Sequence, residues 1–318
     1  MVTADPLRIA FFGTPDFAVP SLRALVASRH RVVGVVTQPD RPRGRGQRVT
    51  DAPVKQAAAE SQLPVLQPDR LRDPTFTAAF AGWAADLGVV AAYGKLIPDE
   101  LLNLPRYGMI NVHASLLPKY RGAAPVHRAV IDGEPETGVT IMRVVKALDT
   151  GGMFAKATRA IGPDDTSAEV ERALAALGAP LLIRVVDEIA SGSAHEEPQD
   201  DRLSTYAPRL TRDEGLVDWS LSAPALHNRV RGLHPWPHAY TYLEGVRLII
   251  IRSRVEPRPT TESPGTIVVV SSDGIEVATG ADGRLALVEV QPEGRRAMPV
   301  RDFLAGHSVS AGSRLTAR

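Results

Sequence analysis

Three side chains in the first half of the sequence have types and a spacing that suit joint chemistry. Asn111 and His113 follow an apolar run at 108–110 that is typical of the end of a buried strand. Because side chains alternate between the two faces of a strand, we expect Asn111 and His113 on the same side. Asp149 lies downstream in a glycine-flanked turn. Since an amide can donate to an oxyanion, an imidazole can transfer a proton and a carboxylate can orient that imidazole, the set favours acyl transfer without a covalent enzyme intermediate.

The composition excludes several competing chemistries. The sequence contains no cysteine, so thiolate nucleophiles, disulfides and the usual structural zinc sites are ruled out. It has no G-x-S-x-G nucleophile motif, and its eight histidines lack the spacing of zinc ligands. An aspartate in a loop, such as Asp149, is more often a cap or a turn former, and from residue types alone that alternative stays open.

The elements that must position these side chains follow an alternating pattern. Short apolar runs separated by helical periodicity predict a parallel α/β domain, in which ligands bind at the carboxyl ends of the strands. We expect strands at 7–12, 31–37, 65–66, 87–92, 108–110, 137–144 and 153–161, and helices at 17–26, 54–61, 73–82, 124–131 and 166–189. Thr166-Ser167-Ala168-Glu169 predicts a capping box on the last helix. The first strand ends in a single glycine, Gly13, which disfavours a dinucleotide site because a G-x-G-x-x-G fingerprint is missing.

One connection in this pattern is far longer than the usual 2–6 residues or so of α/β units. This loop, residues 38–53, carries Arg41, Arg43, Arg45 and Arg48 between glycines and prolines. Guanidinium groups fork onto phosphate oxygens, so the loop suits contact with a phosphate backbone. A solvated flexible loop is the alternative, and the residues by themselves favour neither.

The last third of the sequence has a different pattern. Residues 191–207 are polar and acidic, lack periodicity and are typical of an interdomain linker. Beyond them, β-like runs at 239–243, 246–254, 265–270, 274–279 and 285–290 are split by hairpin signals such as Asp273-Gly274. This spacing predicts a small β-barrel or sandwich within 208–318, after an α/β domain at 1–190. A five-stranded barrel that carries arginines suits nucleic-acid binding, although many small barrels bind none.

The bulk properties set further limits. A length of 318 residues is comfortable for two domains, and a net charge of +1 confines any nucleic-acid affinity to local patches. No apolar run approaches about 18 residues, and the amino terminus enters a strand-like run without a signal-peptide pattern. We therefore expect a cytoplasmic protein with no membrane partner.

The residues around the three candidates are more specific than their types. The sequence reads Asn111-x-His113-x-Ser115-Leu116-Leu117-Pro118-x-x-Arg121-Gly122, followed downstream by Leu148-Asp149-Thr150-Gly151. This pattern resembles the folate-dependent formyltransferases, which carry a catalytic Asn, His and Asp. Four further features are similar to the branch of that family that formylates methionyl-tRNA: Phe12-Gly13-Thr14-Pro15-x-Phe17-Ala18, Thr37-Gln38-Pro39-Asp40-x-Pro42-x-Gly44-Arg45-Gly46, Glu136-Thr137-Gly138-Val139-Thr140-Ile141-Met142, and Asp218-Trp219-Ser220 with Pro235-Trp236-Pro237. The resemblance spans nearly the whole chain; one departure is Gln47-Arg48, where relatives often carry a Lys-Lys pair.

The resemblance implies a fold, a reaction and a set of roles. The fold would be α/β, with a Rossmann-like, mainly parallel sheet in an N-terminal formyltransferase domain and a smaller C-terminal OB-like β-barrel domain. The formyl donor would be 10-formyltetrahydrofolate. The α-amine of methionyl-initiator tRNA would attack it directly through a tetrahedral intermediate, giving N-formylmethionyl-tRNA for translation initiation. Asn111 would hold the formyl oxygen, His113 would stabilise the oxyanion, and Asp149 would tune His113 and help move the amine proton, with no metal taking part.

The same resemblance assigns the binding residues. Main-chain and side-chain groups of 115–118 would shape the folate site, and 93–97 and 143–148 would wall the pterin. The folate-binding residues expected are Tyr93, Leu96, Ile97, Ser115, Leu116, Leu117, Pro118 and Val144. The acceptor stem and aminoacyl end of the tRNA would contact Arg41, Arg43, Arg45 and Arg48, and the barrel would contact the tRNA backbone. The protein would act as a monomer.

Two alternatives to this function remain. A glycinamide ribonucleotide or amino-sugar nucleotide formyltransferase would apply the same chemistry to a small amine. The glycinamide enzymes lack the long arginine loop and the C-terminal domain, whereas the sugar enzymes carry a similar second domain. The other alternative is a catalytically dead RNA-binding relative, and the intact Asn111, His113 and Asp149 argue against it.

Overall fold

The apolar runs of the first half form a seven-stranded sheet in the computed structural model, which describes residues 5–43 and 48–317. The strands, in the spatial order β10-β9-β7-β6-β1-β2-β5, are β1 (Arg8–Gly13), β2 (Arg31–Val36), β5 (Val65–Leu66), β6 (Leu87–Ala91), β7 (Met109–His113), β9 (Glu136–Arg143) and β10 (Met153–Ala160). β1 pairs in parallel with β2 and β6, and β6 with β7, whereas β7 and β9 are antiparallel. The Rossmann-like, mainly parallel sheet predicted from the sequence is therefore present.

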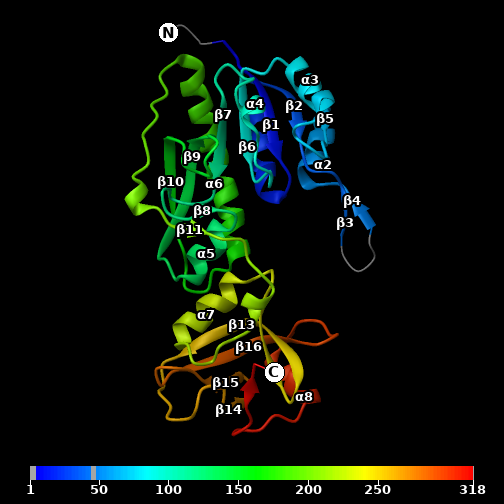
Figure 1. Ribbon diagram of the computed structural model, residues 1–318. Coiled ribbons are helices and arrows are strands. Elements are labelled where there is room, and N and C mark those ends of the chain that lie inside the picture. Colours follow the sequence, from blue (N-terminus) through cyan, green and yellow to red (C-terminus); the bar gives the residue numbers. More distant parts are fainter. Residues whose placement is uncertain (1–4, 44–47, 318) are drawn as a thin grey trace. The chain divides into compact units, whose positions relative to one another are not determined.

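Helices flank this sheet, and all but the short α4 lie where the sequence predicts helical periodicity. They are η1 (Asp16–Ala18), α1 (Val19–Ala27), α2 (Pro53–Glu60), α3 (Pro74–Gly82), α4 (Asp99–Leu102) and α6 (Ser167–Ser191). In Figure 1, α2 and α3 lie beside the β2–β5 edge of the sheet. The long helix α6 packs on β7 and β9 at Gly178, where an added Cβ would lie 3.1 Å from Val112 and 3.2 Å from Val139. The predicted capping box is confirmed, since Thr166 N–H donates to Glu169 Oε2 at 2.8 Å and Glu169 N–H donates to Thr166 Oγ1 at 3.3 Å.

The chain forms two structural units. The first comprises Met1–Pro125, Thr137–Ala160 and Glu171–Ala207, and the second comprises Val126–Glu136, Ile161–Val170 and Pro208–Arg318. Residues 191–207, which we expected to be a linker, group with the first unit. There Glu197 and Met153 exchange main-chain hydrogen bonds of 2.7 and 2.9 Å, and β11 (Tyr206–Ala207) pairs in parallel with β8 (Arg121–Gly122) after η2 (Asp201–Leu203). This segment is therefore held to the first unit by main-chain hydrogen bonds, and its role as an interdomain linker stays a prediction.

The second unit is built around an antiparallel sheet with the order β14-β15-β16-β13-β12-β18. Its strands are β12 (Ala239–Leu243), β13 (Val246–Glu256), β14 (Ile267–Ser271), β15 (Gly274–Ala278), β16 (Arg284–Pro292), β17 (Met298–Pro299) and β18 (Leu315–Thr316), and its helices are α5 (Pro125–Ile131), η3 (Asp213–Gly215), α7 (Ala223–Gly232) and α8 (Val300–Gly306). Ile267 N–H donates to the Ser313 carbonyl and Leu315 N–H to the Gly265 carbonyl, both at 2.8 Å, so the outer strands meet at one end. This half-barrel agrees with the predicted OB-like domain; β17 and β18 are too short to leave a periodic signal in the sequence.

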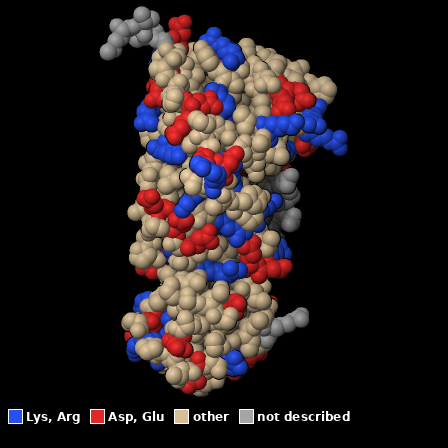
Figure 2. Space-filling view, turned by 60° about the vertical axis from the view of Figure 1, so that its left-hand side comes forward, with Lys and Arg blue, Asp and Glu red and all other residues tan. Residues whose placement is uncertain are grey.

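Charged side chains of both signs are scattered over the face of the molecule that Figure 2 shows. On the face seen in Figure 2, Lys and Arg side chains are interspersed with Asp and Glu, as 37 basic and 36 acidic residues in the whole chain lead one to expect. Strong binding of a polyanion therefore requires a local concentration of basic residues. Within the described ranges, no helix combines the length and the apolar character that a membrane span needs.

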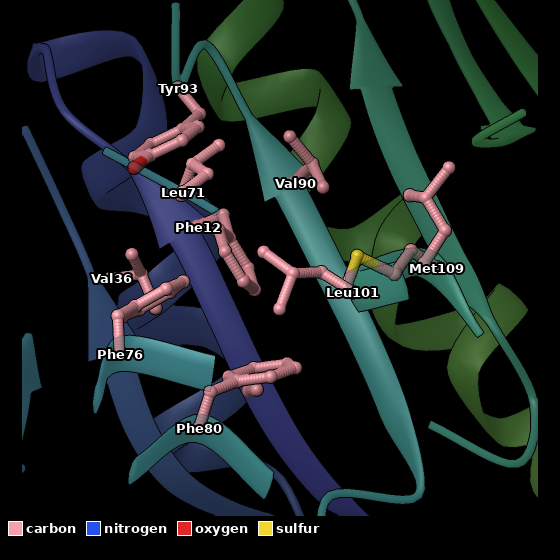
Figure 3. Packing of buried hydrophobic residues seen from close by; sticks show 11 residues of the cluster. Phe12, Val36, Leu71, Phe76, Phe80, Val90, Tyr93, Leu101 and Met109 are labelled. Atoms are coloured by element: carbon pink, nitrogen blue, oxygen red, sulfur yellow. The ribbon is translucent and has the colours of Figure 1, made fainter. Parts of the chain in front are cut away.

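One core cluster of the first unit supports the loops at the carboxyl ends of the strands (Figure 3). Its buried members are Ala10, Phe12, Val36, Leu71, Phe76, Phe80, Val90, Tyr93, Leu101, Leu102 and Met109. Phe12 meets Phe80 and Tyr93 edge-on, with ring centroids 5.4 and 5.5 Å apart. Truncating a buried phenylalanine of this kind to alanine costs about 3–5 kcal/mol. Ile97 and Val144 pack on the same cluster, so the segments that follow β6 and β9 are anchored to one another through it.

Candidate active site

His113 ends β7 and is held between two partners. Its side chain is almost fully buried, with Nε2 3.0 Å from the Tyr120 carbonyl and Nδ1 3.7 Å from Asp149 Oδ2. A carbonyl only accepts hydrogen bonds, so Nε2 must carry a proton in the first contact. Nδ1 then faces the carboxylate, at a distance that favours ion pairing over a direct hydrogen bond. Asp149 can therefore orient the imidazole from its Nδ1 side while the Tyr120 carbonyl holds it from its Nε2 side.

Asn111 lies on the same face of β7 as His113, as the strand period predicts. Val112, between them, turns to the other face and contacts Gly178 of α6. Asn111 is half-buried and pairs across the sheet with Met142 and Val90. Its amide is thus fixed to a rigid strand near the imidazole, which is where a donor to an oxyanion would be needed.

Asp149 occupies a turn in the left-handed region of the backbone, with φ +52°. Its Oδ2 accepts a hydrogen bond of 2.9 Å from the Gly122 N–H, which directs the carboxylate toward His113. Aspartate tolerates this region better than most residues, so the turn-former alternative is compatible with the catalytic one. We call Asn111, His113, Asp149 and the segment 120–122 the His113 corner.

The 115–118 loop, which we predicted to bind folate, is stabilised by hydrogen bonds and packing contacts of its own residues. Ser115 is fully buried and donates through Oγ to the Lys119 carbonyl at 2.6 Å. Thr140 Oγ1 donates to the Ser115 carbonyl at 2.7 Å and accepts from the Leu117 N–H at 3.1 Å. Leu117 packs with Met142 in a small buried cluster, whereas Pro118 and Leu116 are half-buried. These contacts support the loop after His113 and leave its folate contacts a prediction.

The predicted pterin walls, 93–97 and 143–148, differ in exposure along their length. Ile97 and Val144 pack on the core cluster, while Leu96 is 76% exposed. Val145 and Leu148 are also exposed, so apolar side chains from both segments are accessible to a ligand. Both segments thus combine exposed apolar side chains with a residue that packs on the core cluster.

Tyr93 and Arg143 belong to these segments, but their side chains contact other parts of the protein. The Tyr93 ring lies inside the core cluster, and burial raises the pKa of its phenol to about 12. The Arg143 guanidinium donates to the Tyr107 carbonyl at 2.5 Å and to Glu196 Oε2 at 3.1 Å. It lines a hollow of about 490 Å³ that also includes Gly108, at the end of β7 opposite His113. This hollow is therefore not part of the His113 corner.

The arginine loop contains a short hairpin with a fixed root. β3 (Arg41–Arg43) and β4 (Arg48–Thr50) form an antiparallel pair, and the tip with Arg45 lies outside the described residues. At the root, the Lys55 ammonium donates to Asp40 and, at 2.7 Å, to Asp51. The hydrogen bond from Lys55 holds the pKa of the Asp40 carboxyl below its usual value.

Sequence reasoning missed the residues of 191–207 that complete the His113 corner. Thr205 accepts the Tyr120 N–H through Oγ1 at 2.8 Å and the Arg121 N–H through its carbonyl at 2.9 Å. Gln199 donates to the main chain of the Asp149 turn at 2.8 Å. A single polar segment without periodicity gives no signal for such contacts. Among the described residues, no group of His, Cys, Asp or Glu side chains could hold a metal ion.

Known proteins share this fold and these motifs. Residues 7–186 match the formyl transferase family, and residues 209–308 match the C-terminal domain of formyl transferases. The fold, the His113 corner and this match together define the chain as a formyl transferase.

Similar proteins indicate which branch of the formyl transferases this chain belongs to. The chain is 46% identical over 309 residues to the methionyl-tRNA formyltransferase of Citrifermentans bemidjiense, covering 97% of this chain and 96% of that protein. It is 46% identical over 305 residues to the methionyl-tRNA formyltransferase of Bacillus subtilis, covering 96% of each chain. The chain belongs to the methionyl-tRNA formyltransferase family, as its motifs indicate.

Solved structures share the fold at lower identity. The sugar 3N-formyl transferase WlaRD, in the presence of dTDP and 5-N-formyl-THF, has a TM-score of 0.66 at 16% identity, over 91% of this chain and 99% of that one. HypX from Aquifex aeolicus, in complex with tetrahydrofolic acid, has a TM-score of 0.62 at 17% identity, over 94% of this chain and 47% of that one. At such identities the likeness concerns the fold alone.

Proposed function

We propose that this protein transfers a formyl group from 10-formyltetrahydrofolate to the α-amine of methionyl-initiator tRNA, giving N-formylmethionyl-tRNA for translation initiation. The family membership over nearly the full length supports the reaction class. The observation that carries the chemistry is the placement of His113, with Nε2 bound to the Tyr120 carbonyl and Nδ1 facing Asp149. That arrangement holds the imidazole in one orientation on the same strand face as the Asn111 amide.

The His113 corner acts on charge that develops during attack by the amine. The Asn111 amide donates to the formyl oxygen as it becomes an oxyanion, and His113 stabilises the same oxyanion. A new bond joins the amine nitrogen to the formyl carbon, and the bond from that carbon to the folate nitrogen breaks. Asp149 tunes His113 and helps pass the amine proton toward the departing nitrogen. No covalent intermediate with the protein is needed.

The donor site lies, in this proposal, between the two apolar segments that follow β6 and β9. The exposed Leu96, Val145 and Leu148 suit the faces of a flat heterocycle, and Ile97 and Val144 keep both segments on the same rigid core. The main chain of these segments would supply the hydrogen bonds that orient the pterin. HypX in complex with tetrahydrofolic acid and WlaRD in the presence of 5-N-formyl-THF share this fold, which supports a folate donor here.

The tRNA contacts we propose are electrostatic and lie away from the chemistry. Arg41, Arg43, Arg45 and Arg48 concentrate positive charge in one short stretch of a chain whose net charge is only +1. They would contact phosphates near the acceptor stem and aminoacyl end, while the half-barrel contacts the tRNA backbone. We propose that the protein works as a monomer in the cytoplasm, where initiator tRNA is charged.

An amino-sugar acceptor is the alternative, because a sugar formyl transferase shares the fold. The identity to that protein is 16%, against 46% to methionyl-tRNA formyltransferases, so the alternative is not favoured. A relative without activity is not favoured either, since the His113 corner is fully assembled.

A formylation assay with 10-formyltetrahydrofolate tests the proposal. The acceptors to compare are methionyl-initiator tRNA, methionyl-elongator tRNA and an amino-sugar nucleotide at matched concentrations. We expect the highest kcat/KM with methionyl-initiator tRNA. Formylation of the sugar nucleotide without formylation of charged tRNA would contradict the proposal.

A further inference from the structure

Gln199 lies between α6 and β11, outside the motifs that surround the candidate catalytic residues. Its side-chain nitrogen donates to the carbonyls of Asp149 and Gly151, both at 2.8 Å. Its side-chain oxygen accepts from Arg121, at 3.0 Å from Nε and 2.8 Å from Nη2. Because carbonyls only accept and a guanidinium only donates, these partners determine the orientation of the amide. Both hydrogens of the amide nitrogen and both lone pairs of its oxygen are used.

The turn that Gln199 binds has little freedom to adopt another shape. Asp149 has φ +52°, a region that costs an ordinary L residue roughly 1–2 kcal/mol. An added Cβ on Gly151 would lie 2.0 Å from the Arg143 carbonyl, so this part of the turn lies directly against the end of β9. The Gln199 amide binds the Asp149 and Gly151 carbonyls, which lie before and after Thr150. It therefore helps to hold this turn in its left-handed conformation.

Arg121, which donates to the Gln199 side-chain oxygen, belongs to the segment that binds His113. Within the segment 120–122, the Tyr120 carbonyl accepts from His113 Nε2 at 3.0 Å and the Gly122 N–H donates to Asp149 Oδ2 at 2.9 Å. Arg121, between them, has a side chain that is 12% exposed and also pairs with Asp201 at 2.7 Å. One side-chain amide thus joins the segment that orients the imidazole to the turn that carries the carboxylate.

We propose that Gln199 is a positioning residue that holds Asp149 in register with His113 during formyl transfer. The inference rests on the catalytic roles proposed for those two residues. Gln199 itself binds only the main chain of the Asp149 turn and the Arg121 side chain, so it acts through Asp149. Misplacing a catalytic group by about 1 Å can cost about 100-fold in rate, which is the scale expected when the amide is lost.

Two substitutions separate the donors of Gln199 from its shape. Gln199→Met removes all four hydrogen bonds at similar volume. Gln199→Glu keeps the shape and the bonds from Arg121, but it brings a carboxylate against two carbonyl oxygens without a proton to donate. We expect both variants to lower kcat about 10–100-fold, with Gln199→Glu at least as impaired, while KM for methionyl-tRNA and for the folate stays nearly unchanged.

A matched control and a double variant test the route through Asp149. Gln291 donates to the Arg295 carbonyl at 2.8 Å in the second unit, so Gln291→Met should retain wild-type kcat. In an Asp149→Asn background, Gln199→Met should lower kcat no further, because the group it positions has already lost its charge. Thermal unfolding of each full-length variant measures any loss of folding.

Three results would overturn the inference. They are wild-type kcat in Gln199→Glu, an additive loss in the double variant, and a loss of kcat that follows a lower Tm and disappears on cooling. Asp149→Asn alone tests the proposed function separately. Wild-type turnover in that variant would refute the role of Asp149 and with it this inference, whereas an impaired Asp149→Asn with an unimpaired Gln199→Glu would refute only the role of Gln199.

Discussion

The His113 corner and the arginine hairpin both belong to the first unit, yet they are constructed in opposite ways. In the corner, His113 has protein partners at both ring nitrogens, and Gln199 joins the Asp149 turn to Arg121. The hairpin is a two-stranded sheet of its own, and at its root Lys55 binds Asp40 and Asp51. The difference follows from the two tasks. Stabilising an oxyanion requires donors held in advance, whereas attracting a phosphate backbone requires charge and reach.

The largest expected effect comes from removing the imidazole of the corner. His113→Ala should lower kcat by roughly 100- to 10,000-fold, the usual range for losing an acid–base group, while the affinity for the folate donor changes little. Steady-state kinetics together with equilibrium folate binding measure the two quantities. An equal loss of turnover and folate affinity would indicate that His113 serves binding or folding, and the contrast with the hairpin would then fail.

Neutralising the hairpin should change binding rather than chemistry. Replacing Arg41, Arg43 and Arg45 with Gln should raise KM for tRNA, leave kcat at saturation nearly unchanged, and reduce the slope of log affinity against log salt by about 2–3, since each phosphate contact contributes about 0.7–0.9. Titrations with tRNA over a salt series give the slope. An unchanged slope would make the hairpin a solvated loop.

Removing the Lys55 contacts at the hairpin root should have a smaller effect on KM for tRNA. Lys55→Met leaves the arginines in place but removes the ammonium that binds Asp40 and Asp51, so KM for tRNA should rise less than in the triple variant. Lys156→Met, at an exposed position of β10, is the control. A KM equal to that of the control would mean that the root does not direct the hairpin.

The pairing of Lys55 with Asp40 at the hairpin root can be tested by the pH dependence of folding stability. The pKa of Asp40 is lowered from 3.8, chiefly by the hydrogen bond from Lys55. A lowered carboxyl pKa contributes stability above the unfolded-state value, and that contribution is lost as the pH falls through the folded-state value. The urea midpoints of wild type and Lys55→Met should therefore differ at neutral pH and converge in acid below pH 3.8. Parallel midpoints through that range would contradict the pairing.

The smallest effect on formyl transfer is expected for Tyr93→Phe. This variant tests whether the Tyr93 side chain, or only the main chain of its segment, contacts the folate donor. Within the described residues its buried hydroxyl has no hydrogen-bond partner, so Tyr93→Phe should leave formyl transfer unchanged and stabilise the fold by up to about 1–3 kcal/mol. Spectroscopic titration should lose a tyrosine that titrates near pH 12, because burial raises the pKa of Tyr93 to about 12. A weaker affinity for folate would show instead that the phenol contacts the donor.

Local patterns made much of the fold predictable. The buried strands β1 and β6 are continuous apolar runs, and the capping box at Thr166 and Glu169 marks the start of α6 to within a residue. The two-residue period of a strand was enough to place Asn111 and His113 on one face of β7. Contacts between distant segments were not predictable in this way. Ser115 and Leu117 face the interior of their loop, and residues 191–207 bind the first unit although their composition is that of a linker.

The sequence by itself determined the reaction class, because Asn111, His113 and Asp149 stand in motifs long enough to identify formyl transfer, and it determined the strands and helices that carry them. Only the tertiary structure decided how these groups are held. The 3.7 Å approach of His113 to Asp149 depends on Tyr120 and Gly122, and the turn of Asp149 depends on Gln199, 50 residues further along the chain. The physical reason is that periodicity and turn propensity act between neighbours in sequence, whereas hydrogen bonds that orient a catalytic group depend only on proximity in the folded chain.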